Sequence, residues 1–196
     1  MAPGTALDAA TILTATEEVL RRYGARRATV VDVARALGVS HAAVYRHFPS
    51  KAALREAVTR RWLARSHEDL ARLAADAALA PPERLRAWLL ALFAVKRARS
   101  ADDPELFATY RVLVTEQGAA AAEHLALLRE QLAGIVAEGI ARGDFAPGDP
   151  AGTARAVFDA TAAFHHPAHC GEWEADGTEA ALDGVCTLLL DGLRPR

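Results

Sequence analysis

The segment from residue 29 to residue 51, TVVDVARALGVSHAAVYRHFPSK, constrains the fold more than any other part of the chain. Apolar residues recur at helical spacing in its first half, and Thr29 followed three residues later by Asp32 is typical of a capping box. Gly38 lies where this helix must end, because glycine reaches the left-handed conformation without a steric penalty. Ser40 is placed to cap a second helix. The pattern predicts two short helices joined by a tight turn, at about residues 30–37 and 41–47.

The second of these helices has one buried and one outward face. Val44 and Phe48 lie four residues apart and are expected to pack it against the first helix. The outward residues are short at the leading end and bulky at the trailing end: His41, Ala42, Tyr45 and Arg46. Short side chains let the backbone approach base edges, and larger ones supply hydrogen-bonding groups. The segment therefore predicts a helix-turn-helix that enters a groove of double-stranded DNA.

The rest of the chain shows helical periodicity almost throughout, interrupted by glycine and proline. We predict a first helix from about residue 8 to 23 and one long helix from Ser50 to about residue 76. Further helices are expected at about 82–99, 104–114, 118–142, 150–165 and 177–193. The predicted fold class is all-α, with an N-terminal three-helix helix-turn-helix domain and a helical effector-binding and dimerisation domain, over residues 1–50 and 51–196.

Charge is distributed unevenly along the chain. Residues 1–65 contain 11 Lys and Arg against 5 Asp and Glu, a difference of +6, whereas residues 66–196 contain 12 against 20, a difference of −8. A basic module on an acidic body is typical of a protein whose first part binds a polyanion. Lys51 fits this interpretation, because a cation at a helix start opposes the helix dipole unless a phosphate docks there. A solvated lysine and a chance division of surface charge are the alternatives.

Several features bear on the compartment. The two cysteines, Cys170 and Cys186, are too few for a disulfide framework, which favours a reducing environment. The longest strongly apolar run, residues 87–95, is too short to cross a bilayer. Residues 1–7 lack the apolar core of a secretory signal. We therefore expect a cytoplasmic protein with no membrane partner.

These features together resemble the TetR family of bacterial regulators. The family's DNA-binding domain shows a Thr-initiated helix, Gly-Val-Ser at the turn and an aromatic-rich ending, to which Val44-Tyr45-Arg46-His47-Phe48 and Ser50-Lys51 are similar. The resemblance covers residues 8 to about 62 and is specific as a whole, although Gly-Val-Ser alone would not be. It implies a TetR-like fold and a ligand-responsive repressor that binds a palindromic operator as a homodimer. A small-molecule effector would release the DNA, and no cofactor is expected.

By position, the resemblance also implies which residues contact DNA. Phosphate contacts correspond to Thr29, Tyr45, His47 and Lys51. Base-edge contacts correspond to His41, Ala42 and Arg46, with Ala42 standing where many members have Gly or Pro. Ser40, the predicted cap, completes the DNA-binding set.

The last two predicted helices differ in composition from the others. The first is rich in Ala, Gly and Thr, and the second carries an apolar side formed by Leu182, Val185, Cys186, Leu189 and Leu193. Small residues let helix axes approach closely, which suits an intersubunit four-helix bundle with a second copy. The resemblance implies the same dimer. An intrachain hairpin that covers the core fits the periodicity equally well.

The position of an effector is less constrained by the sequence. The candidates for a ligand pocket are aromatic residues on the central helices: Trp62, Trp88, Phe93, Phe107, Tyr110 and Phe158. Each of them also fits ordinary core packing, so a hydrophobic or aromatic effector is a hypothesis.

A cluster of metal-ligand residue types follows the penultimate predicted helix and consists of His165, His166, His169 and Cys170. The alternative function is therefore a metal-responsive regulator that senses through this cluster. Pro167 interrupts the local geometry, no typical ligand spacing occurs, and a helix end favours histidine for electrostatic reasons. We therefore predict no metal site and keep the cluster as the alternative.

Enzymatic activity is not expected. The sequence contains no nucleophile elbow, P-loop, dinucleotide fingerprint or His-Glu-x-x-His motif. His124 or His166 with Cys170 or Asp159 could form a catalytic group, but no spacing singles them out. A protein-interaction module without DNA binding is disfavoured by the outer face of residues 41–47 and by the charge of the N-terminal third.

Overall fold

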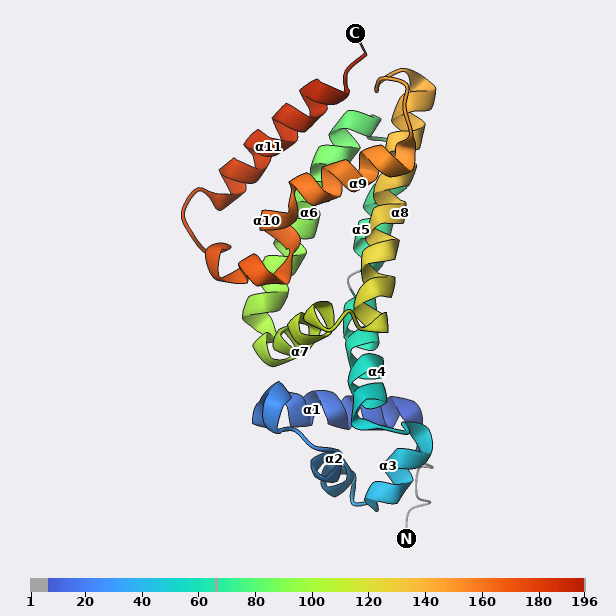
Figure 1. Ribbon diagram of the computed structural model, residues 1–196, viewed down its shortest axis with the longest axis vertical. Helices are drawn as coiled ribbons and strands as arrows, with labels where there is room; N and C mark the ends of the chain where they lie inside the picture. The colour runs from blue at the N-terminus through green and yellow to red at the C-terminus, as the bar shows by residue number, and fades with distance from the viewer. Residues whose placement is uncertain (1–6, 66, 196) are drawn as a thin grey trace. The chain divides into compact units, whose positions relative to one another are not determined.

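The computed structural model describes residues 7–65 and 67–195 of the chain. Over these residues it is built from α-helices and one 3₁₀ helix, and no β-strand occurs among them (Figure 1). The all-α prediction is therefore confirmed. The chain divides into two compact units. The first consists of the residues up to Leu63 together with Asp103–Ala122. The second consists of Ala64–Asp102 and the residues from Glu123 onward. The functional boundary at residue 50 stays a prediction.

The first unit contains the predicted three-helix head and two further helices. Helix α1 packs against α2 and α7, and α2 packs against α3. The bounds of α1 reach Arg27, but Gly24, with a φ of 77° and a ψ of 158°, is non-helical, so the regular helix ends at the predicted residue 23 and a short second segment follows the kink. The bounds in this unit are α1 (Ala9–Arg27), α2 (Val30–Leu37), α3 (His41–His47), α4 (Lys51–Ala64) and α7 (Pro104–Thr115).

The turn between α2 and α3 follows the predicted local chemistry. The Thr29 hydroxyl accepts a hydrogen bond from the Asp32 N–H at 3.2 Å, and the Asp32 carboxylate accepts one from the Thr29 N–H at 3.1 Å. Gly38 ends α2 in the left-handed conformation, with a φ of 66°. The Ser40 hydroxyl accepts a hydrogen bond from the Ala43 N–H at 3.2 Å. Each end of the turn is thus stabilised by a side chain or by glycine.

The prediction of one long helix from Ser50 to about residue 76 is wrong. The structure has α4 (Lys51–Ala64) followed by α5 (His67–Ala74). Residues four apart on an α-helix drift by about 40° around its axis, so Leu54 and Leu70 would lie about 160° apart on one straight helix. Both are buried. Because the helix is broken, α4 buries Leu54 in the first unit and α5 buries Leu70 in the second.

The second unit is centred on α6. This helix packs against α5, α10, η1 and α11. Trp88, Leu92 and Phe93 of α6 are buried, as are Leu128 and Leu132 of α8. Helix α8 begins in the first unit and continues into the second. The remaining bounds are α6 (Pro81–Asp102), α8 (Ala119–Arg142), α9 (Pro150–Ala160), α10 (Ala162–His165), η1 (Pro167–Glu172) and α11 (Thr178–Leu193).

The predicted helix at 150–165 is interrupted at Thr161. Its hydroxyl donates to the carbonyl oxygens of Val157 at 3.0 Å and Phe158 at 3.2 Å, and its φ and ψ of −98° and 11° end α9. Such bonding from a threonine to the preceding turn is known to bend helices. Helix α10 then starts in a new direction, so the prediction of one helix is corrected to two.

Helix α11 has a buried apolar side and an exposed leucine on the opposite side. Leu182 and Cys186 are buried, and the helix packs against α6 of the same chain. Leu188, on the other side, is 74% exposed.

Among the described residues, no helix combines the length and the hydropathy that a membrane span requires.

Candidate nucleic-acid interface

The eight predicted DNA-contact residues all lie at the surface of the first unit. Helix α3 buries Ala43 and Val44, while Phe48 just after it is half-buried. Helices α2 and α3 pack against each other, and the buried side of α3 leaves the opposite face outward. The exposed residues are Thr29, Ser40, His41, Ala42, Tyr45, Arg46, His47 and Lys51.

The outward face of α3 is partly ordered by its own side chains. The rings of His41 and Tyr45, one helical turn apart, meet edge to face with centroids 6.3 Å apart. Tyr45 remains 41% exposed, although it is aromatic. An aromatic side chain with a hydroxyl at its tip can pack on a sugar and donate to a phosphate at the same time. This arrangement suits backbone contact by Tyr45 beside base contact by Arg46.

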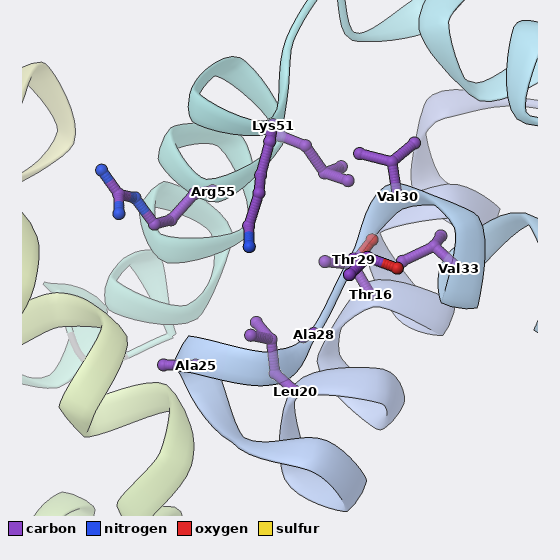
Figure 2. Close-up of a pocket in the computed structure, with 10 residues that line it drawn as sticks. Thr16, Leu20, Ala25, Ala28, Thr29, Val30, Val33, Lys51 and Arg55 are labelled. Carbon is purple, nitrogen blue, oxygen red and sulfur yellow. The ribbon is translucent and has the colours of Figure 1, made fainter.

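Thr29 and Lys51 are brought close together although they begin different helices. Both line a small pocket between α1, α2 and α4, and Figure 2 shows Lys51 extending from α4 with Thr29 across from it. The volume of the pocket is about 30 Å³, enough for one or two water molecules and too small for an organic effector. The start of α4 carries partial positive charge and Lys51 adds a full one, which favours an anion such as a phosphate, whereas the Asp32 carboxylate already occupies the start of α2.

The Thr29 hydroxyl also serves the helix cap. It donates to the Asp32 carboxylate at 2.6 Å, and this hydrogen bond is the main reason why the pKa of Asp32 is lowered. The charged Asp32 in turn pairs with Arg35 at 3.2 Å. The cap therefore holds the start of α2 in position, whether or not DNA is bound.

A buried carboxylate joins the helices that support the head. Glu17 of α1 has a side chain that is 5% exposed, and it accepts hydrogen bonds from Arg61 of α4 at 2.8 and 3.0 Å. Arg21 lies 3.4 Å from the same carboxylate and 2.8 Å from Asp103. Arg61 also donates to the Ala10 carbonyl oxygen at 3.0 Å. This network fixes α4, whose first turn carries Lys51, to α1.

The six aromatic candidates for a ligand pocket are all buried, and they are divided between the two units. Trp62 packs against Phe107 and Tyr110 in the first unit, with ring centroids 6.3 Å apart in both pairs. In the second unit Phe93 packs against Phe164 and Trp173. The other two second-unit candidates are Trp88, which donates to Gln131 at 3.0 Å, and Phe158, which packs against His165. Their role in ligand binding stays a prediction.

The His/Cys cluster is not assembled as a metal site. No group of three or more His, Cys, Asp or Glu side chains able to hold a metal ion occurs within residues 7–65 and 67–195. His165 is buried, with Nε2 2.9 Å from the Phe158 carbonyl oxygen, and His166 caps the next turn by accepting from the Ala168 N–H at 3.3 Å. His169 instead faces Glu172 at 3.8 Å. His165 and His166 contact the backbone and His169 faces a side chain, so no observation favours the metal-responsive alternative.

Sequence reasoning missed a polar cluster inside the second unit, which we call the lysine–histidine cluster and define as Lys96, His124 and His67. Lys96 Nζ lies 2.7 Å from His124 Nε2, and His124 Nδ1 lies 2.6 Å from His67 Nε2. Burial lowers the pKa of Lys96 to about 7, and it lowers the pKa of His124 well below its usual value. One sequence signal could have found it, since Lys96 follows Phe93 and Leu92 at helical spacing on the buried side of the predicted helix.

Two family profiles match the chain. Residues 12–58 match the profile described as bacterial regulatory proteins, tetR family. Residues 81–186 match the profile described as tetracyclin repressor-like, C-terminal domain. The first covers α2 and α3 with their caps, and the second covers α6 through most of α11. A search of curated proteins found no match to the chain.

Solved structures share the fold. A protein of unknown function from Rhodococcus sp. RHA1 is 22% identical, with a TM-score of 0.76 and complete coverage of both chains. The transcriptional regulator FadR from Bacillus subtilis, solved with stearoyl-CoA, is 20% identical, with a TM-score of 0.66 over 95% of this chain and 100% of that one. RolR, solved with resorcinol, is 16% identical, with a TM-score of 0.65 over 94% of this chain and 86% of that one. At such identities the likeness shows the fold alone.

Proposed function

Because the chain belongs to the TetR family of bacterial regulatory proteins, we propose that it is a ligand-responsive repressor that binds a palindromic operator as a homodimer. This family consists of DNA-binding transcriptional regulators rather than enzymes. The observation that carries the proposal is the split of α3, which buries Ala43 and Val44 and exposes His41, Tyr45 and Arg46. The seven-residue helix α3 is therefore packed against the first unit on its buried side and presents its exposed side as a recognition helix.

The exposure of the eight residues and their positions in the family's DNA-binding segment support the proposed contacts. Thr29, Tyr45, His47 and Lys51 contact phosphates, which supply most of the affinity and make it depend steeply on salt. His41, Ala42 and Arg46 face the base edges and supply the sequence preference. The capped turn and the Glu17–Arg61 ion pair hold the phosphate-contacting residues and the base-contacting residues in a fixed relative orientation.

Dimerisation uses the outward faces of α9 and α11. Leu188 and small residues of both helices are exposed, whereas the opposite faces pack within the chain. A surface of small residues around an exposed leucine suits close helix packing with a second copy. Two recognition helices in a two-fold dimer then enter successive major grooves about 34 Å apart.

An effector binds the helical body and shifts the dimer to a second state. In that state the separation of the two recognition helices no longer matches the separation of successive major grooves. Two proteins with the same fold, FadR and RolR, were solved with stearoyl-CoA and resorcinol, which supports ligand binding by such a body. The effector releases DNA only to the extent that it binds the released state more tightly.

The DNA interface is tested with three variants of the full chain. The operator is first obtained by selecting genomic fragments that the protein retains, and binding is then measured by fluorescence anisotropy across a series of salt concentrations. Lys51→Ala should weaken binding to all duplexes alike and reduce the salt slope by about 1. Arg46→Ala should cost about 1–3 kcal/mol on the operator and change the preferred bases. The control is Arg72→Ala, since Arg72 is an exposed cation of α5 paired with Asp69.

Equal binding by the Lys51→Ala, Arg46→Ala and Arg72→Ala proteins at every salt concentration would place the interface elsewhere. A loss of affinity in Arg46→Ala without any change in base preference would make Arg46 a phosphate contact instead.

A further inference from the structure

Positive charge is concentrated at the end of α1. Residues 19–31 contain no Asp or Glu and four arginines, all of them exposed: Arg21, Arg22, Arg26 and Arg27. Arg21 pairs with Asp103 at 2.8 Å. Within residues 7–65 and 67–195, the other three arginines form no ion pair with an acidic side chain. Neighbouring cations that lack an acidic partner favour a polyanion as the binding partner.

The short segment that carries Arg26 and Arg27 is held at both ends. Gly24 is non-helical, with a φ of 77°, so the chain changes direction just before this segment. The Ala25 N–H donates to the carboxylate of Glu105 on α7 at 3.3 Å, and a Cβ atom at Gly24 would lie 3.0 Å from the same carboxylate. At the other end, the N–H of residue 28 donates to the Gly24 carbonyl oxygen at 3.0 Å. The two arginines therefore start from a backbone of defined position.

This segment lies beside two of the proposed phosphate contacts, Thr29 and Lys51. Ala25 and Ala28 line the same small pocket as those two residues, and Figure 2 shows the Lys51 side chain extending from α4 towards them. The two arginines between the alanines are exposed and do not line the pocket. Their side chains are therefore at the surface, next to the pocket to which Lys51 belongs.

The distance from this segment to a neighbouring phosphate is short. Consecutive Cα atoms are about 3.8 Å apart, so the Cα atom of Arg27 lies within about 7.6 Å of that of Thr29. Phosphates on one DNA strand follow each other at about 3.4 Å along the helix axis. A long side chain two or three residues before Thr29 therefore reaches phosphates adjacent to the one that Thr29 contacts. Guanidinium groups suit this role, because they remain charged and donate two hydrogen bonds to one phosphate.

We propose that Arg26 and Arg27 form a second phosphate-contact surface, which binds the DNA backbone next to the phosphates held by Thr29 and Lys51. The inference rests on the proposed function, because it extends the DNA interface to the end of α1. Contacts of this kind add affinity for every sequence alike, since phosphates carry no sequence information. The alternative is that the two arginines only stabilise the end of a helix through its dipole, in which case DNA affinity does not depend on them.

The salt dependence of DNA binding tests the proposal. The full chain with both Arg26→Ala and Arg27→Ala is compared with wild type by fluorescence anisotropy, on the selected operator and on a scrambled duplex of equal length. We expect affinity for both duplexes to fall at least about tenfold and the salt slope to become shallower by about 0.9 for each lost phosphate contact. The ratio of the two affinities should not change. An unchanged affinity and slope, or a changed ratio, would overturn the proposal.

Two further proteins separate charge from structure. The double variant Arg26→Lys with Arg27→Lys keeps both positive charges and should retain most of the salt slope. Arg111→Ala removes an exposed arginine of α7 in the same unit, which also forms no ion pair with an acid among the described residues, and should bind like wild type. If the lysine variant loses as much of the slope as the alanine variant, positive charge is not the cause and the proposal is overturned.

Ethylation of single phosphates locates the contact on the operator. The phosphates whose ethylation no longer interferes in Lys51→Ala are identified first. In the Arg26→Ala and Arg27→Ala double variant, interference should disappear at phosphates next to these and persist at the Lys51 phosphates themselves. Identical interference patterns for the double variant and wild type would overturn the proposal.

The same measurements distinguish this inference from the proposed function. If wild type retains no duplex at low ionic strength, the proposed function fails and the inference fails with it. If wild type prefers its operator and the double variant binds exactly as strongly at every salt concentration, the inference alone is overturned.

Discussion

At the residue scale, arginine and lysine occupy different kinds of site: arginines pair with carboxylates, whereas a lysine lies in the interior of the second unit. Arg61 and Arg21 hold the buried Glu17, and Arg84 holds Glu138 at 2.6 Å, because the planar guanidinium fits a carboxylate and keeps its charge. The interior position on α6 has Lys96 instead. An ammonium group can lose its proton when it is buried, whereas a guanidinium cannot. The residue type therefore permits a neutral side chain at this buried position, where burial lowers the pKa of Lys96 to about 7.

Glu17 provides a test of stability at this scale. Replacing Glu17 by Gln removes the charge that Arg61 and Arg21 share, while Arg21 keeps its ion pair with Asp103. Arg61 remains bonded to the Ala10 carbonyl and is partly exposed, so we expect a loss of about 2 kcal/mol in the free energy of unfolding, below the cost for a fully buried pair. Urea denaturation measures the change.

The neighbouring residue supplies the control. Glu18 is exposed on the same helix, and Glu18→Gln should change the free energy of unfolding by less than about 0.5 kcal/mol. Equal stabilities of the Glu17 and Glu18 variants would show that the ion pairs contribute nothing measurable.

At the element scale, the turn that joins α2 to α3 depends on backbone conformation as much as on side chains. Gly38 has a φ of 66°, and a Cβ atom built there would meet nothing within 4 Å. Gly134 lies in the exposed middle of α8 and would likewise meet nothing. The two positions therefore differ in backbone conformation alone, not in available space.

Alanine substitutions at these two glycines should have opposite effects. Gly38→Ala should destabilise the chain by about 1 kcal/mol, because a Cβ atom is strained in the left-handed conformation. Gly134→Ala should stabilise it by up to about 1 kcal/mol, because alanine is the better helix former. Chemical denaturation of both variants measures the changes, and a stabilising Gly38→Ala would contradict the role assigned to the turn.

At the scale of the whole molecule, the proposed repressor needs a second copy. Helix α11 packs against α6 through Leu182 and Cys186, yet it leaves Leu188 74% exposed. Periodicity alone left an intersubunit bundle and an intrachain hairpin equally open. The structure shows that one side of α11 is used within the chain, and the proposal assigns the other side to the partner subunit.

A charge at the centre of the proposed interface should separate the subunits. Leu188→Asp is expected to weaken the dimer at least tenfold, because burying an unpaired carboxylate costs more than about 1.4 kcal/mol. Sedimentation velocity over a range of concentrations measures the association. Leu127→Asp, at a 43% exposed leucine of α8, is the control and should leave the dimer intact. A dimer that survives Leu188→Asp unchanged would place the interface on another surface.

Local sequence determined the head of this protein. The bounds of α2 and α3, the Thr29–Asp32 capping box, the turn at Gly38 and the cap at Ser40 were all predicted correctly. Each of these features depends on residues within four positions of one another, and such short-range chemistry is readable from the chain. The residues predicted to contact DNA are exposed, and those on α3 lie opposite the buried Ala43 and Val44.

Tertiary packing decided the rest. The break between α4 and α5 depends on which side of each helix is buried, and a continuous apolar pattern does not reveal a change of partner. Lys96 and His124 are 28 residues apart, and His124 and His67 are 57 apart. Periodicity predicts the face on which such a residue lies. Only the packing of α5, α6 and α8 determines which groups meet there, because partners distant in sequence are brought together by the fold.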